Sequence, residues 1–230
     1  MVYCLKIFVL VKIFFCCFFF TMLFIKVSFG SETIDVYGGY QTAPHSRVEG
    51  RYSDEETSEN FFNFTAGWKG KSFSFPPYYG LRYTKWKMNS GWGLDFNHTK
   101  LYADKETLAK NGIEILQFTD GLNNLTFHRQ IKPNFVLFSG MPYWGYGVGI
   151  TIPHVEFQRT SDSVKTYEYQ YGGPTVAFNF GIKYRLLNQS SFFYEYKFTS
   201  SWLDANLNDG GFIKSRIFTN ALNLGISFQF

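Results

Sequence analysis

The sequence predicts an all-β protein, an eight-stranded antiparallel transmembrane β-barrel of a Gram-negative outer membrane that follows a cleaved signal peptide. Three observations predict it. The chain begins with a short, strongly apolar segment that ends in small residues. The rest of the chain has segments of about ten residues in which apolar and polar side chains alternate. The last of these segments ends on phenylalanine.

Residues 1–30 have the features of an export signal, which leaves residues 31–230 as one barrel domain. Two lysines precede an almost wholly apolar run over residues 13–25, and Ser28 and Gly30 place small side chains before the expected cleavage point. The alternative is a retained membrane anchor, because the apolar run approaches the roughly 20 residues that span a bilayer. The small-residue pattern favours cleavage.

Charge and cysteine content limit the chemistry of the mature domain. All three cysteines lie in the export signal, so we expect no disulfide, no thiolate nucleophile and no cysteine-bound zinc after cleavage. The formal net charge of +4 includes the three lysines of that segment, and their removal leaves +1. A nearly neutral domain provides no electrostatic basis for binding nucleic acid.

The C-terminal segment shows the alternation most clearly. One face suits lipid, and the other suits a polar barrel interior. The lipid-type face carries Leu222, Leu224, Ile226, Phe228 and Phe230, and the interior face carries Ala221, Asn223, Gly225, Ser227 and Gln229. Because an alternating strand that ends on phenylalanine is typical of substrates of the outer-membrane assembly machinery, we expect that machinery to bind Phe230.

Eight strands are expected when short turns are assigned to the periplasmic end and long loops to the outside. The predicted strands are 32–41, 77–88, 91–102, 119–131, 142–157, 172–186, 190–203 and 217–230. The predicted outside loops are 42–76, 103–118, 158–171 and 204–216. Residues 132–141 fit a simple turn poorly because Phe135 to Phe138 are all apolar, so we expect them to extend a strand or to pack under the barrel.

A soluble lipocalin-like barrel is the structural alternative, and it would point apolar side chains inward. Here the predicted inward positions are largely charged or polar, which favours the membrane barrel. They include Asp35, Arg82, Asp95, Lys183, Arg185, Glu195, Lys197 and Gln229. Such charges would have to pair inside the barrel. Since eight strands enclose an interior filled by side chains, we expect no pore and place the function at the rim or on the outer wall.

Three of the four histidines fall near the predicted extracellular rim. His45 follows the first strand, and His98 and His154 lie high on the third and fifth, where alternation turns both toward the outer wall. Asp104 and Glu156 share this level, so the five residues are candidate catalytic groups. Nitrogen and oxygen donors also suit a metal. The alternative is that interfacial side chains simply touch lipid phosphates at this depth.

Several segments together resemble the outer-membrane lipid A oxidase family of alphaproteobacteria. They occur in the right order over most of the mature chain, which makes the resemblance more specific than a lone motif. They are residues 40–46, 68–73, 76–80, 96–104, 118–123, 153–156, 195–197 and 219–223. Residues 51–60 and 132–141 depart from the family pattern, and neither departure includes a histidine.

The resemblance implies an oxygen-dependent oxidation of the proximal glucosamine of lipid A to 2-aminogluconate, with hydrogen peroxide as the co-product. Molecular oxygen would be the oxidant, and lipid A in lipopolysaccharide the partner, beside other outer-membrane lipids. Redox chemistry of this kind uses a metal or an organic cofactor, and no flavin motif is present. We hypothesise that His45, His98 and His154, with Asp104 or Glu156, hold a divalent metal or act as the base for the sugar hydroxyl.

Two other functions remain open. A non-enzymatic surface barrel, adhesive or structural and porin-like without a pore, would suit the charged segment 51–60, but not the compact Pro-His and Pro-Pro blocks of the rim. Another lipid A-modifying barrel, an acyl hydrolase or transferase, would need a nucleophile beside a base. Ser46 next to His45 is the nearest candidate for it.

Overall fold

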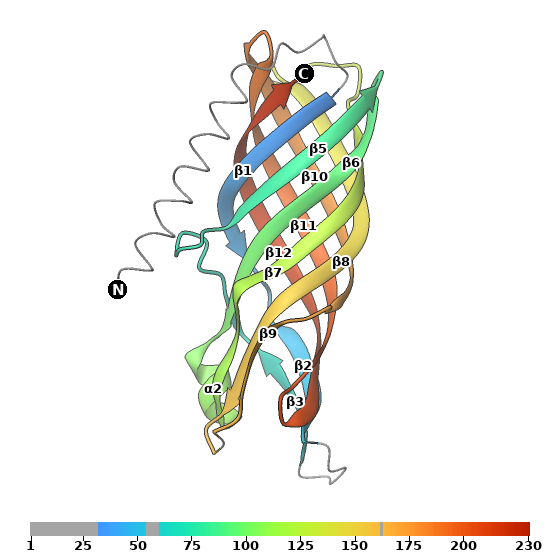
Figure 1. Ribbon diagram of the computed structural model, residues 1–230. Coiled ribbons are helices and arrows are strands. Elements are labelled where there is room, and N and C mark those ends of the chain that lie inside the picture. The colour runs from blue at the N-terminus through green and yellow to red at the C-terminus, as the bar shows by residue number, and fades with distance from the viewer. Residues whose placement is uncertain (1–31, 54–59, 162) are drawn as a thin grey trace, which may run out of the picture. The chain divides into compact units, whose positions relative to one another are not determined.

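The computed structural model describes residues 32–53, 60–161 and 163–230, and the predicted signal peptide lies outside them. Eight antiparallel strands form a closed ring in chain order, because the last strand pairs with the first (Figure 1). These strands are β1 (Glu32–Thr42), β5 (Tyr79–Lys87), β6 (Ser90–Ala103), β7 (Ile113–Ile131), β8 (Met141–Arg159), β10 (Gly173–Leu187), β11 (Ser190–Asn206) and β12 (Gly210–Gln229). The predicted eight-stranded barrel is confirmed.

Large apolar side chains cover the outer wall of the ring. Leu94, Phe127 and Leu224 are each at least half exposed, and the same outward positions are apolar on every ring strand. Exposed apolar area on this scale is stable only in contact with lipid. The chain is therefore an outer-membrane β-barrel. Among the described residues, no helix has the length and apolar content to cross a bilayer.

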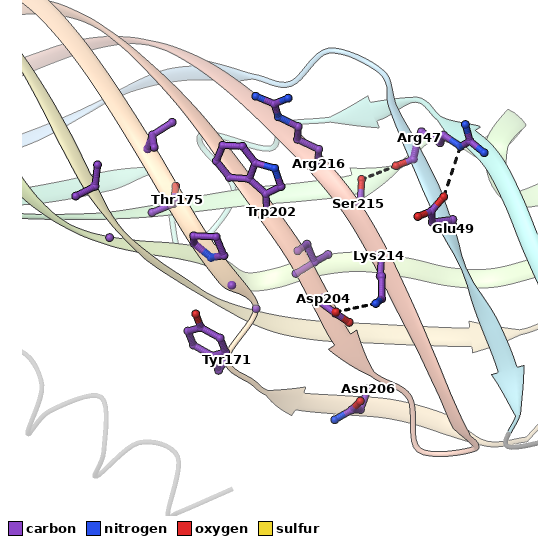
Figure 2. Close-up of a pocket in the computed structure, with 17 residues that line it drawn as sticks. Arg47, Glu49, Tyr171, Thr175, Trp202, Asp204, Asn206, Lys214, Ser215 and Arg216 are labelled. Carbon is purple, nitrogen blue, oxygen red and sulfur yellow. Dashed lines mark hydrogen bonds and ion pairs between the residues drawn. The ribbon is translucent and has the colours of Figure 1, made fainter.

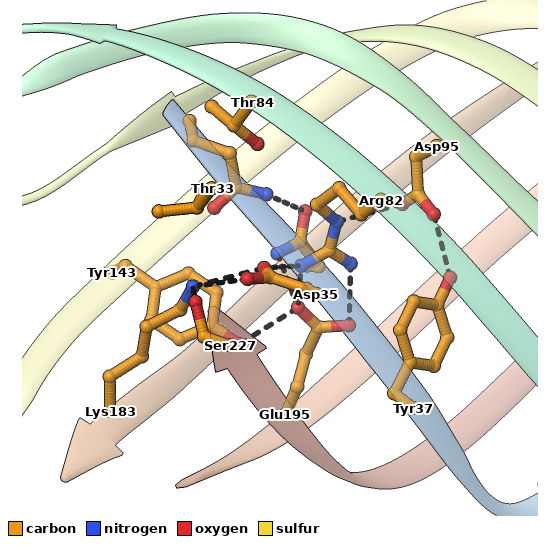
Figure 3. Close-up of polar contacts among 12 residues, drawn as sticks. Thr33, Asp35, Tyr37, Arg82, Thr84, Asp95, Tyr143, Lys183, Glu195 and Ser227 are labelled. Atoms are coloured by element: carbon orange, nitrogen blue, oxygen red, sulfur yellow. Dashed lines mark hydrogen bonds and ion pairs between the residues drawn. The ribbon is translucent and has the colours of Figure 1, made fainter. Parts of the chain in front are cut away.

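The barrel interior at the membrane level holds a buried ionic network, as the alternation predicted. Arg82 lies at its centre, where it donates two hydrogen bonds to Glu195, at 2.7 and 2.8 Å, and one to Asp95, at 3.1 Å (Figure 3). Lys197 donates to Asp95 at 2.8 Å, and Lys183 donates to Asp35 at 2.8 Å. Three cations thus face three carboxylates, so the buried charges balance.

Two of the predicted inward residues lie outside this network. Arg185 and Gln229 occupy the periplasmic ends of β10 and β12, and both are solvent-exposed. Alternation predicts correctly which way these two side chains are directed, but both lie at the strand ends, where the side chains are exposed to solvent.

The predicted outside loops contain more secondary structure than expected. They form β2 (Ser46–Ser53), β3 (Phe61–Ala66), β4 (Trp68–Lys69), helix α2 (Lys105–Lys110) and β9 (Lys165–Tyr169). β2 pairs with the first part of β12, β3 pairs with β2, and β9 pairs with β8. These elements continue the barrel wall beyond the membrane, at the lower end of Figure 1.

The physical reason for this extension is a change of polarity inside the barrel. On the extracellular side of the ionic network the inward positions become apolar, and their side chains pack as a hydrophobic core like that of a soluble protein. Its most buried members are Val48, Ala66, Leu101, Phe118, Leu122, Val155 and Ile217, all with 0% exposure. Segments that cover such a core fold as strands and a helix instead of open loops.

Residues 132–141 do neither of the things predicted for them. They form a loop between β7 and β8 in which Leu137 and Gly140 exchange two backbone hydrogen bonds of 2.9 Å. The side chains of Phe135 and Phe138 are 58% and 78% exposed, so they project outward and do not pack beneath the barrel.

Candidate functional site

A bulge in β7 organises the candidate site. Between Gln117 and Leu122, β7 has two residues more than the facing stretch of β8, Pro153 to Glu156. The pairing with β6 shifts at the same place. Gly121 takes a φ of +106° there, which glycine adopts without strain. Such bulges re-aim side chains, and here the bulge places Asp120 between the two neighbouring strands.

His98 on β6 is held by Asn123 of the bulged strand. Its Nδ1 lies 2.8 Å from Asn123 Oδ1, and Asn123 Nδ2 donates to the backbone oxygen of Asp120 at 3.2 Å. Because the Asn123 amide is oriented in this way, its Oδ1 must accept a proton from His98 Nδ1. In the neutral imidazole, Nε2 then carries the lone pair. Among the described residues, Nε2 is buried without a hydrogen-bond partner.

Packing fixes the position of the His98 ring. Tyr79 stacks on it with ring centroids 5.2 Å apart. A Cβ at Gly121 would come within 2.4 Å of His98 Nδ1, so any side chain there would displace the imidazole. The histidine is only 4% exposed.

His154 on β8 lies against β9, the strand that extends the wall. Its ring contacts Tyr167 and Tyr169, with centroids at 4.5 and 4.6 Å, and it is 3% exposed. His154 Nδ1 lies 3.7 Å from Asp120 Oδ2 and 3.8 Å from Glu156 Oε1. These distances suit an ion pair with a protonated imidazole but exceed a hydrogen bond.

Glu156 is the most firmly held acid of this region. It accepts hydrogen bonds from Gln117 Nε2, at 3.0 Å, and from Thr119 Oγ1, and Lys165 Nζ lies 3.3 Å away. The other acid, Asp120, is fixed through its backbone oxygen, to which Tyr169 donates at 3.1 Å. We call His98, Asp120, His154 and Glu156 the histidine cluster. All four lie near the extracellular ends of β6, β7 and β8.

The structure brings together three of the predicted residues and adds one that sequence reasoning missed. His98, His154 and Glu156 were predicted, and Asp120 was not. The available signal was the Asp120-Gly121 pair within an otherwise alternating segment, since Asp-Gly in a strand pattern indicates a turn or a bulge.

His45 and Asp104 lie together at a different place. A Cβ added to Gly67 would come within 2.2 Å of Asp104 Oδ2 and 3.3 Å of His45 Nε2, so the two side chains meet at this glycine. His45 is exposed. Asp104 is the N-cap of α2, where its Oδ1 accepts from the Thr107 backbone N–H at 2.8 Å. That hydrogen bond holds the pKa of Asp104 below its ordinary value.

The predicted three-histidine metal site is not assembled, because His45 belongs to the Asp104 pair and not to the cluster of His98 and His154. Within residues 32–53, 60–161 and 163–230, no three His, Cys, Asp or Glu side chains are grouped as metal ligands would be. His45 lies in the connection between β1 and β2 and meets Asp104 beyond the end of β6, whereas His98 lies within β6 and His154 within β8.

Replacement of Asp104 tests its role as a capping residue. We expect Asp104→Asn to preserve α2 and the free energy of unfolding at neutral pH, because asparagine caps helices about as well as aspartate. The lowered pKa means that the carboxylate cap is complete above the ordinary pKa of aspartate and weakens as the pH falls through the lowered value. The free energy of unfolding, measured for both proteins over a pH series, checks this, and a clear loss of stability in Asp104→Asn at neutral pH would contradict the capping role.

A groove with a volume of about 1210 Å³ lies on the outer wall (Figure 2). Residues of β2, β8, β10, β11 and β12 line it, together with the connection from β9 to β10. We call it the outer-wall groove. Its lining combines aromatic and aliphatic side chains with Arg47, Lys214 and Arg216.

Solved structures with a similar arrangement are small barrels. Neisserial surface protein A is 9% identical, with 87% of this chain and 97% of that chain covered and a TM-score of 0.48. The outer membrane protein AlkL in lipid bilayers is 14% identical, with 89% and 93% covered and a TM-score of 0.48. The Yersinia pestis attachment invasion locus protein Ail is 10% identical, with 84% and 99% covered and a TM-score of 0.34.

No family model matches the sequence, and no curated protein matches it. The assignment as an outer-membrane barrel therefore rests on the closed ring and the apolar outer wall of this chain itself.

Proposed function

We propose that this outer-membrane barrel is a lipid A oxidase, which uses molecular oxygen to convert the proximal glucosamine of lipid A to 2-aminogluconate. The histidine cluster is the observation that carries the proposal. It combines two buried imidazoles and two carboxylates on the outer wall, at the end of the ring from which the extracellular extension continues. The segments that carry these four residues are among those that resemble the oxidase family.

The position of the cluster suits a substrate in the outer leaflet. Tyr79, Tyr167 and Tyr169 surround the histidines and are 42%, 55% and 57% exposed. Tyrosines collect at a membrane surface because one end of the side chain is apolar and the other is polar. The sugar of lipid A lies at the same depth, directly above its acyl chains.

The proposed reaction balances with oxygen and water. The anomeric carbon, with its ring oxygen and hydroxyl, loses two electrons and two protons to become a lactone, and oxygen takes up both to form hydrogen peroxide. Water then opens the lactone to 2-aminogluconate, so the sugar gains one oxygen atom in total.

The residues present suit the proton transfers in this reaction. His98 Nε2 would accept the proton of the anomeric hydroxyl, since Asn123 holds the tautomer in which this nitrogen has the lone pair. Because Nε2 is buried in the structure, access to it requires a neighbouring side chain to move. Asp120 and Glu156 would stabilise the positive charge of a protonated His154.

Electron transfer from the sugar to oxygen needs a redox group that ordinary side chains do not supply. The described residues do not form a set of three metal ligands, so we assign only proton transfer and positioning to this chain.

Mass spectrometry of lipid A tests the proposed function. A host whose lipid A has a free anomeric hydroxyl would be grown with and without the protein, in air and without oxygen. We expect a gain of one oxygen atom on the proximal sugar only when both the protein and air are present. Unchanged lipid A, with the barrel folded in the outer membrane, would overturn the proposal.

A non-enzymatic surface barrel is the second candidate, and the packed extracellular extension favours it. The apolar core under β2, β3 and α2 holds these elements rigid outside the membrane, as display of a binding surface would require. This function predicts that changes in the extracellular extension reduce cell attachment, whereas changes in the histidine cluster leave it unaltered. Attachment measured with the His98→Ala and His154→Ala variants distinguishes the two candidates.

A further inference from the structure

We propose that the outer-wall groove binds one lipid that carries a phosphorylated headgroup, at a site separate from the histidine cluster. The groove lies on the face formed by β8, β10, β11, β12 and β2, whereas the cluster lies on β6, β7 and β8. The inference does not rest on the oxidase proposal, since a lipid could bind there whether or not it is oxidised.

The groove exists because the barrel wall is incomplete at this point. Regular pairing of β10 with β11 ends at Thr175 and Ser201, and β9, which precedes β10, pairs with β8. The gap is bridged by the side chain of Gln170, whose amide donates to and accepts from the backbone of Asn206, both at 2.8 Å. A backbone hydrogen bond from Asp204 N–H to the Gly172 oxygen, at 2.6 Å, also crosses the gap, so two isolated contacts replace a stretch of regular strand pairing.

Two glycines at the gap leave no room for a side chain. A Cβ at Gly172 would come within 2.7 Å of Pro153 Cδ and 3.1 Å of Leu203 Cδ1, and Gly173 has a φ of +134°. Any side chain at either position would alter the wall beside the groove.

The membrane side of the groove is apolar. Val148 is 62% exposed, Trp202 is 39% exposed, and both occupy outward positions that continue the lipid-facing wall. Because a hollow in this wall is filled by the surrounding bilayer, an acyl chain is the expected occupant of this part.

Cationic side chains lie directly beside this apolar strip, because Arg216 is the strand partner of Trp202. The Arg216 guanidinium lies 4.5 Å from the Trp202 ring centroid and 4.9 Å from that of Phe218, and its Nε donates to Ser200 Oγ at 3.2 Å. In the part of the chain that the structure describes, no carboxylate pairs with Arg216. Its terminal NH groups can therefore bind an anion.

The neighbouring cations are partly neutralised. Lys214 Nζ lies 3.0 Å from Asp204, and Arg47 lies 3.6 Å from Glu49, as Figure 2 shows. Three cations against two carboxylates leave one net positive charge beside an apolar strip. A positive charge next to an apolar surface complements a lipid phosphate next to its acyl chain, and the planar guanidinium matches a phosphate group in geometry.

A matched control residue exists at the opposite end of the barrel. Arg129 lies 4.9 Å from the Trp92 ring centroid, and its Nε donates to Ser90 Oγ at 3.0 Å. Arg129 therefore repeats the arginine, tryptophan and serine arrangement of Arg216, but it does not line the groove.

Native mass spectrometry of the purified barrel in detergent would count bound lipids after addition of phosphorylated lipid A or the same lipid with its phosphates removed. We expect one lipid per barrel to depend on its phosphates for binding. The affinity of this site should be about tenfold lower for the phosphate-free lipid and for Arg216→Gln, which corresponds to the loss of one charge-assisted hydrogen bond. Arg129→Gln and His154→Ala should bind as the unaltered protein does. Gel mobility of the folded barrel would confirm folding.

Three results would overturn the proposal: equal binding of the phosphate-free lipid, equal loss in Arg129→Gln, and competition by inorganic phosphate at the same concentration as the lipid. The last would assign the arginine to free anions. If Arg216→Gln does not fold, Lys214→Gln serves as a second variant of the same groove, with a smaller expected loss because Lys214 is paired with Asp204. His154→Ala separates this result from the oxidase test, since it should lose oxidation and keep lipid binding.

Discussion

Replacement of Arg82 by methionine is expected to lower the free energy of unfolding by about 3–5 kcal/mol, the usual effect of removing one partner from a buried ion pair. Arg82 has 0% exposure and makes three hydrogen bonds to two carboxylates. Without it, Glu195 remains buried with only neutral donors, Tyr143, Asn179 and Asn223. Urea unfolding of the barrel in lipid vesicles measures the change.

The double variant Arg82→Met with Glu195→Gln separates charge balance from packing. It removes one positive and one negative charge, and the glutamine can still accept from Tyr143. We expect it to recover most of the lost stability. Lys85→Met provides the surface comparison, because Lys85 pairs with Glu32 in an exposed ion pair of 3.1 Å, and little change is expected there. An Arg82→Met barrel as stable as the original would contradict the ionic network as a source of stability.

Replacement of His98 by alanine is expected to reduce lipid A oxidation by about 10²–10⁴-fold, the usual contribution of a general base. Asn123 orients the imidazole, and Nε2 is the nitrogen left to accept a proton. Because a base acts only in its neutral form, the proposed role predicts that product formation falls as the pH drops through the pKa of His98. The measurement is the rate of product formation by mass spectrometry over a pH series.

The other histidines act as controls for this result. His45→Ala should leave product formation unchanged, since His45 is exposed beside Asp104, whereas His154→Ala should also reduce it. His128→Gln tests an interior histidine, which contacts Thr84 at 3.0 Å and should affect stability alone. If the His45, His98 and His154 variants are all fully active as folded proteins, the histidines have no role in catalysis.

The outside loops show where sequence patterns stopped being informative. Alternation of apolar and polar residues predicted the ring strands from β1 to β12, because each residue's side depends only on its neighbours in the strand. In the extension the inward residues, such as Val48, are apolar and the outward ones, such as Arg47 and Glu49, are polar, so the contrast between the two faces is the reverse of that in the membrane. The segments 42–76 and 158–171 therefore seemed to be loops, although they contain β2, β3, β4 and β9.

The site was predictable in part for the same reason. The alternation of side chains along a strand placed His98 and His154 on the outer wall. Their closeness to the extracellular ends of the predicted strands placed them near the rim. Asp120 could not be placed, because the two extra residues of β7 change the side and the lateral position of everything between Gln117 and Leu122. Asp104 was placed at the right height, but only the structure shows that it caps α2.

The sequence by itself determined the number of ring strands, their order and the side on which most of their residues lie, since these are local properties of alternating segments. Only the tertiary structure decided which distant residues meet. Arg82 and Glu195 are 113 residues apart and share two hydrogen bonds, and His45 lies apart from the histidines that it was grouped with. The closure of the ring and the bulge in β7 set these lateral distances, and neither is written in the spacing of residues along the chain.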